Sequence, residues 1–352
     1  KLCEEWGAGF SSSGVAIIGT FSRIIKSYDM SMSLRVSNAD FAYRTTLFES
    51  IARVVLIVPN QVDDLHVDLV KLASKWMTDR APNVRSAIAL LLKNIVTTSN
   101  GCKTVTLDAI ISVTNKGITD ETIHVVSEFS LAAASAFVST IKAFRENEER
   151  IRTGQARGGA NSMEAKVVDT ANQNKSMTTK FKEVVSIRKK IVESHDLKTI
   201  VQYLLIQILK SNSSVLRIAN VTILEFLITD LVNELAMDEL QWFLEQIHSM
   251  LHNPTVLALP DNEILLLQFR LSNMIRNAIF SRCGEEIHIQ CAISLLKSLK
   301  SSQAQSYELA FIMNELSHLI NILKEAAIPL IESIETEVLK LLRHDDLLVR
   351  IS

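Results

Sequence analysis

Hydrophobic residues recur at steps of three and four along most of this chain, which is the spacing of one face of an α-helix. The segment from Ala304 to Ala326 shows this clearly, because its apolar positions form one wide stripe and its charged positions lie largely off it. Pro329 fits the first turn of the next helix, where a missing backbone N–H costs nothing. Sustained alternation of period two is not found. The pattern therefore predicts an all-α protein without strands.

The predicted helices are joined by short polar connections, which favours antiparallel neighbours. They cover about 10–29, 40–58, 62–77, 83–98, 104–115, 121–146, 181–193, 197–210, 215–235, 238–252, 262–281, 285–300 and 304–326, with a further helix from Pro329.

One stretch, 150–180, departs from this pattern. It contains three Gly residues and many Asn, Gln, Ser and Thr residues, and it has too little apolar content to be buried. We expect a long loop or flexible insertion there. The segment divides the chain into an N-terminal block, 1–149, and a C-terminal block, 181–352.

A turn followed by an arginine near the start of an apolar helix occurs three times. The three arginines are 132 and 133 residues apart, which corresponds to three units of about 44 residues in each interval. This length lies within the range of HEAT and armadillo repeats. The prediction is an α-solenoid of HEAT-like antiparallel helix pairs. The turn residue and the arginine of each copy are Asp79 and Arg85, Asn212 and Arg217, and Asp345 and Arg350.

These six residues are the predicted site, and its role is structural. The Asp or Asn of each turn is expected to cap the second helix of its pair. The arginine one turn later is expected to bond to a turn of its own or the neighbouring repeat, which makes a ladder of charge-assisted bonds along the stack. The alternative is an ordinary N-cap followed by a solvated arginine.

Composition and charge narrow the function classes. Lys and Arg number 37 and Asp and Glu number 39, so the chain lacks the strongly basic surface typical of nucleic-acid binding. The four cysteines are too few and too scattered for a disulfide framework, which indicates a reducing, intracellular setting. No membrane span is expected, since the charge-free run Phe129–Ile141 is only 13 residues long.

Residues that could carry chemistry are few. Cys283, His288 and Cys291 are spaced like metal ligands, but zinc needs a fourth ligand, so two buried cysteines and a surface histidine are the favoured interpretation. Gly7 and Gly9 do not have the spacing of a dinucleotide-binding loop, and no strand is predicted before them. Convergent acid, base or metal groups are not apparent. We therefore predict a protein that is not an enzyme and has no cofactor or metal.

Two blocks resemble a known family. WMTDRAPNVRSAIALLLKNIV at 76–96 and ELAFIMNELSHLINILKEAAIPLIESIETEVLKLLRHDDLLVR at 308–350 are similar to repeats of the HEAT-repeat-containing protein 5 family. The fungal member of that family is the large accessory protein of clathrin adaptor complex 1. The Gly-rich break at Gly154, Gly158 and Gly159 falls where the family also has a Gly-rich insertion. The resemblance covers most of the chain in order and suggests an N-terminal fragment of a larger scaffold.

The resemblance implies a non-catalytic scaffold in vesicle trafficking between the trans-Golgi network and endosomes. Its partners would be clathrin adaptor complex 1 and its accessory subunits. The protein would be cytoplasmic and would lie at Golgi and endosomal membranes only indirectly, through its partners. A homo-oligomer, if formed, would use parts of the protein outside the fragment. Another HEAT or armadillo interaction protein, such as a nuclear-transport receptor or a general assembly scaffold, is the alternative.

Overall fold

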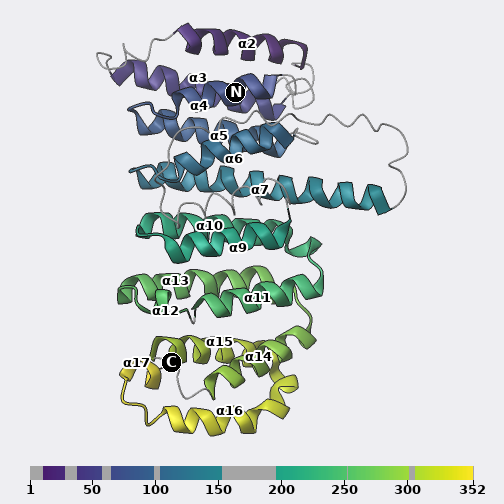
Figure 1. Cartoon of the computed structure of the whole chain (residues 1–352), viewed down its shortest axis with the longest axis vertical. Helices are drawn as coiled ribbons and strands as arrows, with labels where there is room; N and C mark the ends of the chain where they lie inside the picture. The colour runs from purple at the N-terminus through teal and green to yellow at the C-terminus, as the bar shows by residue number, and fades with distance from the viewer. Residues whose placement is uncertain are drawn as a thin grey trace, which may run out of the picture. The chain divides into compact units, whose positions relative to one another are not determined.

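The computed structural model describes residues 11–27, 38–57, 65–98, 104–152, 196–251, 253–300 and 306–351. Helices fill most of these ranges, and no strand occurs within them (Figure 1). The prediction of an all-α protein is confirmed.

The helix ends agree with the predicted ones to within a few residues in most places. The first helices are α2 (Ser11–Ser27), α3 (Asn38–Ile57), α4 (His66–Trp76), α5 (Pro82–Thr98), α6 (Thr104–Gly117) and α7 (Ile123–Arg152). They are followed by α9 (Leu197–Lys210), α10 (Ser214–Leu231), the 3-10 turn η5 (Val232–Glu234), α11 (Met237–Leu251), α12 (Pro254–Leu257), α13 (Asp261–Met274) and the π-helical segment η6 (Ile275–Phe280). The last elements are α14 (Glu285–Leu299), α15 (Ser306–Leu323), the 3-10 turn η7 (Lys324–Ala327), α16 (Ile328–Leu341) and α17 (Leu347–Ile351).

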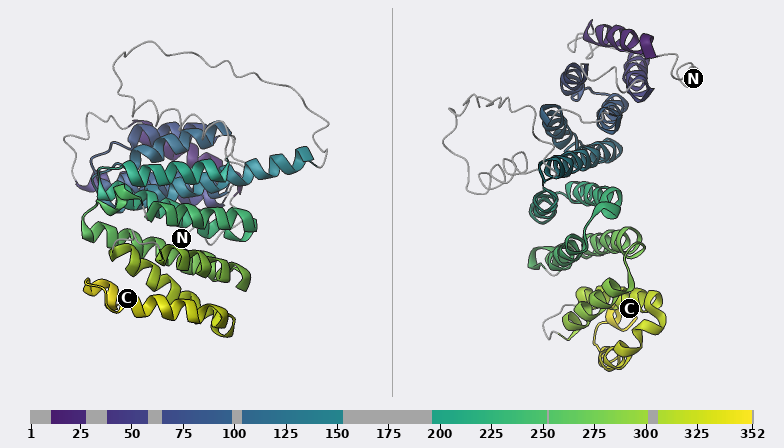
Figure 2. Two further views of the ribbon diagram at one scale, coloured as in Figure 1. Left: turned by 60° about the horizontal axis from the view of Figure 1, so that its bottom comes forward. Right: turned by 90° about the vertical axis from the view of Figure 1, so that its right-hand side faces the viewer.

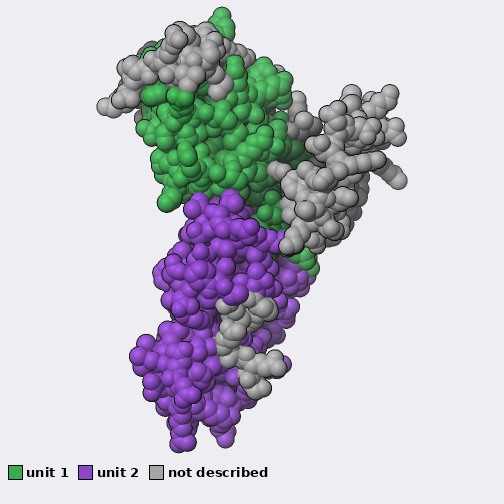
Figure 3. All heavy atoms as spheres, turned by 60° about the vertical axis from the view of Figure 1, so that its left-hand side comes forward, with its two compact units in different colours: residues 1–207, 222–227 green, residues 208–221, 228–352 purple. Residues whose placement is uncertain are grey.

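The chain forms two compact units, coloured separately in Figure 3. One comprises residues 1–207 and 222–227, and the other comprises 208–221 and 228–352, so the division falls within α9 and α10. The predicted insertion at 150–180 begins inside α7, which stays helical to Arg152. Its remainder and the predicted helix at 181–193 lie outside the described residues. The two-block division at that segment therefore stays a prediction.

Within the first unit, helices α2 to α7 pack as three successive pairs in two layers. Helix α2 packs on α3, α4 on α5, and α6 on α7. Helices α3, α5 and α7 are neighbours in one layer, and α2, α4 and α6 are neighbours in the other (Figure 2). Helix α5 has α3 on one side and α7 on the other, and it is accordingly buried around most of its circumference.

Within the second unit the same kind of contacts recur. Helix α14 packs on α15 and also on α16, while α15 packs on α13 and on α17. Helix α13 continues without a break into the π-helical segment η6, which has buried Ile275, Ala278, Ile279 and Phe280. A π-helix in an otherwise regular helix changes the direction in which the following side chains point.

Helix α7 is long and apolar enough over Ile123–Glu146 to cross a membrane by length and composition alone. Of the most apolar stretch of this helix, 61% is buried inside the protein. Phe129, Ala133 and Phe137 are almost fully buried there, and the helix packs on α5 and α6. These contacts are those of a core helix in a helical protein.

The close packing of α6 on α7 predicts opposite effects for two glycine substitutions. A Cβ atom at Gly117 would lie 2.1 Å from Cγ of Phe129, whose side chain is fully buried, whereas a Cβ at Gly19 in α2 would meet nothing within 4 Å. We expect Gly117→Ala to destabilise the protein by about 1–3 kcal/mol or more through overpacking. We expect Gly19→Ala to stabilise it by up to about 1 kcal/mol through helix propensity. Denaturant unfolding of both variants measures the difference, and equal effects would contradict the tight α6–α7 contact.

Candidate functional site: an arginine–carboxylate network at the helix turns

Five of the described turns between consecutive helices share one local hydrogen bond. In each, a side-chain oxygen accepts the backbone N–H two residues further on, which closes the turn before the second helix starts. The oxygens of Asp79, Asp120, Asn253 and Asp346 accept from Ala81, Thr122, Thr255 and Leu348 at 2.9 Å, and Ser211 Oγ accepts from Ser213 at 3.3 Å.

The first arginine of the network is Arg44 of α3, which binds Asp79 of the α4–α5 turn. Its Nε and Nη2 atoms donate to the two carboxylate oxygens at 3.0 and 3.3 Å. The side chains are 1% and 0% exposed, so both charges are removed from water. The guanidinium carbon also lies 4.8 Å from the ring centre of Phe41 and 5.6 Å from that of Trp76. Bidentate bonding and the two aromatic faces together compensate for desolvation of the arginine.

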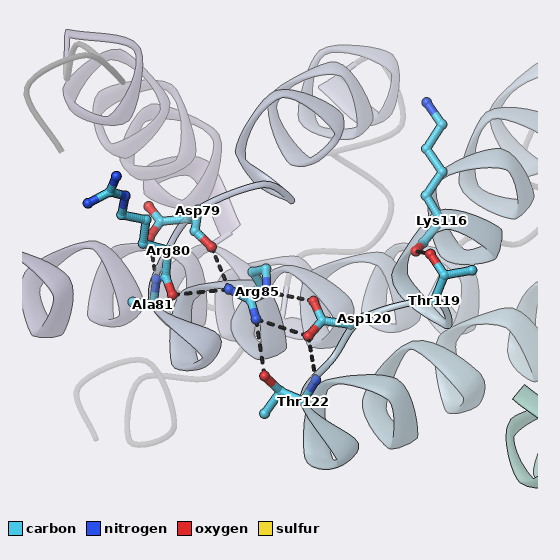
Figure 4. A network of polar contacts seen from close by, with 8 residues as sticks. All are labelled: Asp79, Arg80, Ala81, Arg85, Lys116, Thr119, Asp120 and Thr122. Atoms are coloured by element: carbon cyan, nitrogen blue, oxygen red, sulfur yellow. Dashed lines mark hydrogen bonds and ion pairs between the residues drawn. The ribbon is translucent and has the colours of Figure 1, made fainter. Parts of the chain in front are cut away.

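The second arginine, Arg85 of α5, repeats this bond with the next turn. Its Nε and Nη2 atoms donate to Asp120 at 2.6 and 2.9 Å, and Nη2 also donates to Oγ1 of Thr122 at 3.2 Å (Figure 4). Its Nη1 atom points back to its own turn and donates to the backbone carbonyls of Asp79 at 2.6 Å and Arg80 at 3.1 Å. Asp79 therefore contacts both arginines, one through its carboxylate and one through its carbonyl.

Arg85 also sets the charge state of Asp120. Partial burial raises the pKa of this carboxyl, but the hydrogen bonds from Arg85 and from the backbone N–H of Thr122, with the positive charge of Arg85, more than offset it. The pKa of Asp120 consequently lies below its usual 3.8. The carboxylate is thus held ionised, as a partner of a buried arginine must be.

The two bonds follow one register. Each joins an arginine to an aspartate 35 residues later. The two arginines are 41 residues apart, and so are the two aspartates. The predicted residues Asp79 and Arg85 are both in the network, whereas Arg44 and Asp120 were missed. The repeated spacings of 35 and 41 residues are the signal that would have identified them. The network ends there, because the position six residues after Asp120 is the buried Val126.

In the second unit, Arg217 of α10 makes a similar pair of contacts. Its Nη2 atom donates to the carbonyl of Ser211 at 2.8 Å, the same six-residue return that Arg85 makes to Asp79. Its Nη1 atom binds the carboxylate of Glu263 in the first turn of α13. The structure differs from the prediction at Asn212, which is exposed, since Ser211 makes the turn bond instead. The bond needs an acceptor two residues before the receiving N–H, and Ser211 holds that place.

The last of the three predicted turns, at Asp345 and Arg350, differs more from the prediction. Asp346, and not the exposed Asp345, accepts the N–H of Leu348 and closes the turn. Arg350 is exposed on α17, and within the described part of the chain no carboxylate lies within ion-pair distance of it. The structure therefore brings Arg350 near its turn but does not give it the partner that Arg44, Arg85 and Arg217 have.

A further arginine–carboxylate pair lies where the π-helical segment begins. Arg276 Nη2 donates to Glu315 of α15 at 2.8 Å and to the carbonyl of Asn314 at 3.2 Å. Ser272 of α13 donates its hydroxyl to the same Glu315 oxygen. The Glu315 side chain is 1% exposed. This pair joins α13 to α15, and no repeat motif in the sequence points to it.

The cysteine–histidine group is placed differently from the prediction in one respect. Cys291 is buried and Cys283 half-buried, and both are free thiols. His288 was expected at the surface but is buried, because its Nε2 lies 2.9 Å from the carbonyl of Phe280 and its ring packs edge-on against the Phe280 ring. Burial, with a smaller effect of Cys283, raises the pKa of Cys291 to about 12. A thiol so hard to ionise is a poor metal ligand, and the described residues contain no group of three that could hold a metal ion.

A groove of about 440 Å³ lies between α11 and α14 in the second unit. Leu244 and Ile287 are buried in its floor, and its titratable groups are Glu245, Cys291 and Lys297. Since the Cys291 thiol stays protonated at neutral pH, it cannot act there as an activated nucleophile.

Comparison with protein-family models, with curated proteins and with solved structures gives no match for this chain. The glycines Gly7 and Gly9 lie outside the described residues, as do Cys3 and Cys102.

The buried pairs predict large and selective losses of stability. Arg44→Ala should lower the free energy of unfolding by about 3–5 kcal/mol, because it leaves Asp79 buried without its counter-charge. Arg85→Ala should cost about 1–3 kcal/mol, since five acceptor atoms, on Asp79, Arg80, Asp120 and Thr122, lose a donor. The matched control is Arg350→Ala, which breaks no ion pair among the described residues. Its charge is only the smallest of the influences that lower the pKa of Asp346, so stability should change little. Urea unfolding tests all three, and equal effects at the three positions would contradict the network.

The lowered pKa of Asp120 predicts that the stability of the protein depends on pH. Because its pKa is lowered in the folded state, its stabilising contribution is present above about pH 3.8 and is lost as the pH falls through the lowered value. Asp120→Asn should therefore destabilise the protein at pH 6, and its difference from the unmodified protein should shrink as the pH drops below about 3.8. Urea unfolding of both proteins across this range measures it. A difference that stays constant with pH would mean that the carboxylate charge is not what Arg85 recognises.

Proposed function

We propose that this chain is a non-catalytic HEAT-like scaffold that holds protein partners, and that it works with clathrin adaptor complex 1 in vesicle trafficking. The observation that carries the proposal is the register of Arg44–Asp79 and Arg85–Asp120. The same bond recurs after 41 residues, between successive helix pairs of one two-layered unit. A repeat of this length and helix content is typical of HEAT-like solenoids.

A stack of helix pairs suits a scaffold. Each pair contacts only its neighbours, so the structure extends its surface with every repeat and does not enclose a single pocket. The buried charged groups of the network form ion pairs with each other, Arg44 with Asp79 and Arg85 with Asp120. Their arrangement supports a role in setting the distance between successive pairs, which a protein that positions several partners requires.

The trafficking role rests on the resemblance of 76–96 and 308–350 to the HEAT-repeat-containing protein 5 family. The block 76–96 contains Asp79 and Arg85, so the resemblance includes residues that bond successive pairs. Under the proposal, the protein is cytoplasmic and reaches Golgi and endosomal membranes through adaptor complex 1. A nuclear-transport receptor is the second candidate, and it too is built from helical repeats.

Binding to purified partners tests the proposal. The immobilised 352-residue chain should retain purified clathrin adaptor complex 1 and should not retain a basic nuclear-import peptide. Retention of the adaptor should fall in the Arg44→Ala/Arg85→Ala double variant, because loss of both bonds loosens the spacing of the pairs. The control is Lys71→Ala, which breaks only the exposed Lys71–Asp68 pair and should leave binding unchanged.

Two results would count against the proposal. Retention of the basic peptide in place of the adaptor would favour the nuclear-transport alternative. Retention of neither would remove the trafficking role, while the stability of the Arg44→Ala variant would still report separately on the stacked helix pairs.

A further inference from the structure

The π-helical segment η6 is held by three side chains of the neighbouring helices α14 and α15. His288 of α14 donates from Nε2 to the carbonyl of Phe280 at 2.9 Å, and the two rings meet edge-on with centroids 5.4 Å apart. His318 of α15 stacks on the same Phe280 ring, with centroids 6.4 Å apart and planes 19° apart. Glu315 of α15 binds Arg276 of η6. Because π-helices are rare and frequently lie at functional sites, this cluster of titratable groups indicates more than packing.

The site beside His318 already contains one matched pair of charges. Arg276 donates to Oε1 of Glu315 at 2.8 Å, and the Glu315 side chain is 1% exposed. The same oxygen accepts the Ser272 hydroxyl, whereas the buried Oε2 has no hydrogen-bond partner among the described residues. A proton on His318 would therefore place a second cation beside a single carboxylate in a mostly buried site, which is unfavourable.

The pKa of His318 is lowered below its usual 6.5, as this arrangement requires. The largest cause is burial, and the charge of Arg276 adds to it. The charge of Glu315 opposes these effects, and His288 adds a smaller one in the same direction as Arg276. The neutral imidazole is consequently the form that suits the closed cluster.

Other charged groups on the helices that pack against α15 lie away from His318. Those of α14, η7 and α17 are exposed, namely Glu285, Glu286, Lys297, Lys324, Glu325 and Arg350. In α13, Asp261 and Glu263 belong to the first turn, and Arg270 stands two residues before Ser272, which places it on another side of the helix. Cys291 of α14 is uncharged at neutral pH, because its pKa is about 12.

We infer that this cluster is a pH-sensitive switch that controls local opening of η6. With His318 neutral, its ring stacks on Phe280 and Glu315 binds Arg276, so η6 stays packed on α14 and α15. When His318 gains a proton, Arg276 and the imidazolium compete for the Glu315 carboxylate, both contacts weaken and η6 opens. The switch lies within the second unit and does not depend on binding to adaptor complex 1.

The sign of the pH effect follows from the lowered pKa of His318. The open form takes up the proton more readily than the closed form, so closure is fully favoured above about pH 6.5. Closure then becomes progressively less favourable as the pH falls from 6.5 toward the lowered pKa.

Hydrogen–deuterium exchange of the peptide 275–282 in the 352-residue chain measures this opening, after correction for the intrinsic effect of pH on exchange. We expect its protection to fall several-fold between about pH 7.5 and about pH 5.5, the range in which a histidine changes charge. The protection of the α5 peptide, 82–98, should stay the same and serves as the internal control.

Three variants separate the switch from general acid sensitivity. His318→Gln cannot be protonated, so the fall in protection of 275–282 should disappear. The matched control is His124→Gln, which removes an exposed histidine of α7 and should leave the fall unchanged. Arg276→Gln should also abolish the fall, because a protonated His318 then has the Glu315 carboxylate without a competing arginine. Circular dichroism at both pH values checks that each variant is folded.

Four outcomes would overturn the inference. Equal protection of 275–282 at both pH values in the unmodified chain would mean that η6 does not respond to pH. An equal fall in 82–98 would mean that the whole protein is destabilised. A fall that persists in His318→Gln would assign the effect to another group. A fall that persists in Arg276→Gln would show that competition for Glu315 is not its cause.

Discussion

The buried pair of Arg44 and Asp79 is the interaction on which the arrangement of the first unit depends. Both side chains are almost completely excluded from water, and each would be strongly unfavourable there alone. Their bidentate geometry, and the faces of Phe41 and Trp76 beside the guanidinium, permit the burial only at one distance and orientation. Apolar side chains tolerate a shift of a helix along its neighbour, but this pair does not. The pair therefore specifies register, while the surrounding leucines and isoleucines supply most of the favourable free energy.

Asp79 links one such bond to the next. Its carboxylate accepts from Arg44 and also closes the turn at Ala81, and its carbonyl accepts from Arg85. A displacement of this one residue would disturb contacts to α3 and α5 together. Neighbouring bonds that share a residue are expected to be non-additive on substitution. The network consequently couples adjacent helix pairs in a way that independent surface ion pairs, such as Lys71–Asp68, do not.

Helical periodicity predicted the fold class and most helix ends, because amphipathic stripes are a local property of the sequence. The turn motif was sufficient to find Asp79, Arg85 and Arg217. It did not identify Arg44 or Asp120, since their importance comes from a partner 35 residues away and not from local sequence. The shift from Asn212 to Ser211, and from Asp345 to Asp346, has a local cause: two polar residues adjoin in each turn, and only backbone geometry selects the acceptor. The buried His288 was missed because its partner is a backbone carbonyl, which no sequence pattern marks.

The arginines of the second unit bind carboxylates at more varied positions than those of the first unit do. Arg217 binds Glu263 at the start of α13, and the short helix α12 lies between the closed turn at Asn253 and α13. Arg276 reaches Glu315 from the beginning of a π-helical segment, where the extra residue per turn changes the direction of the side chains. Both arginines thus meet carboxylates on helices and not on turns. Arg44, Arg85, Arg217 and Arg276, which are buried or half-buried, each have a carboxylate partner, while the position of that carboxylate in the chain varies. A helix can therefore differ in sequence at its turn and still be held against a neighbouring helix, provided that some carboxylate lies within reach of the arginine.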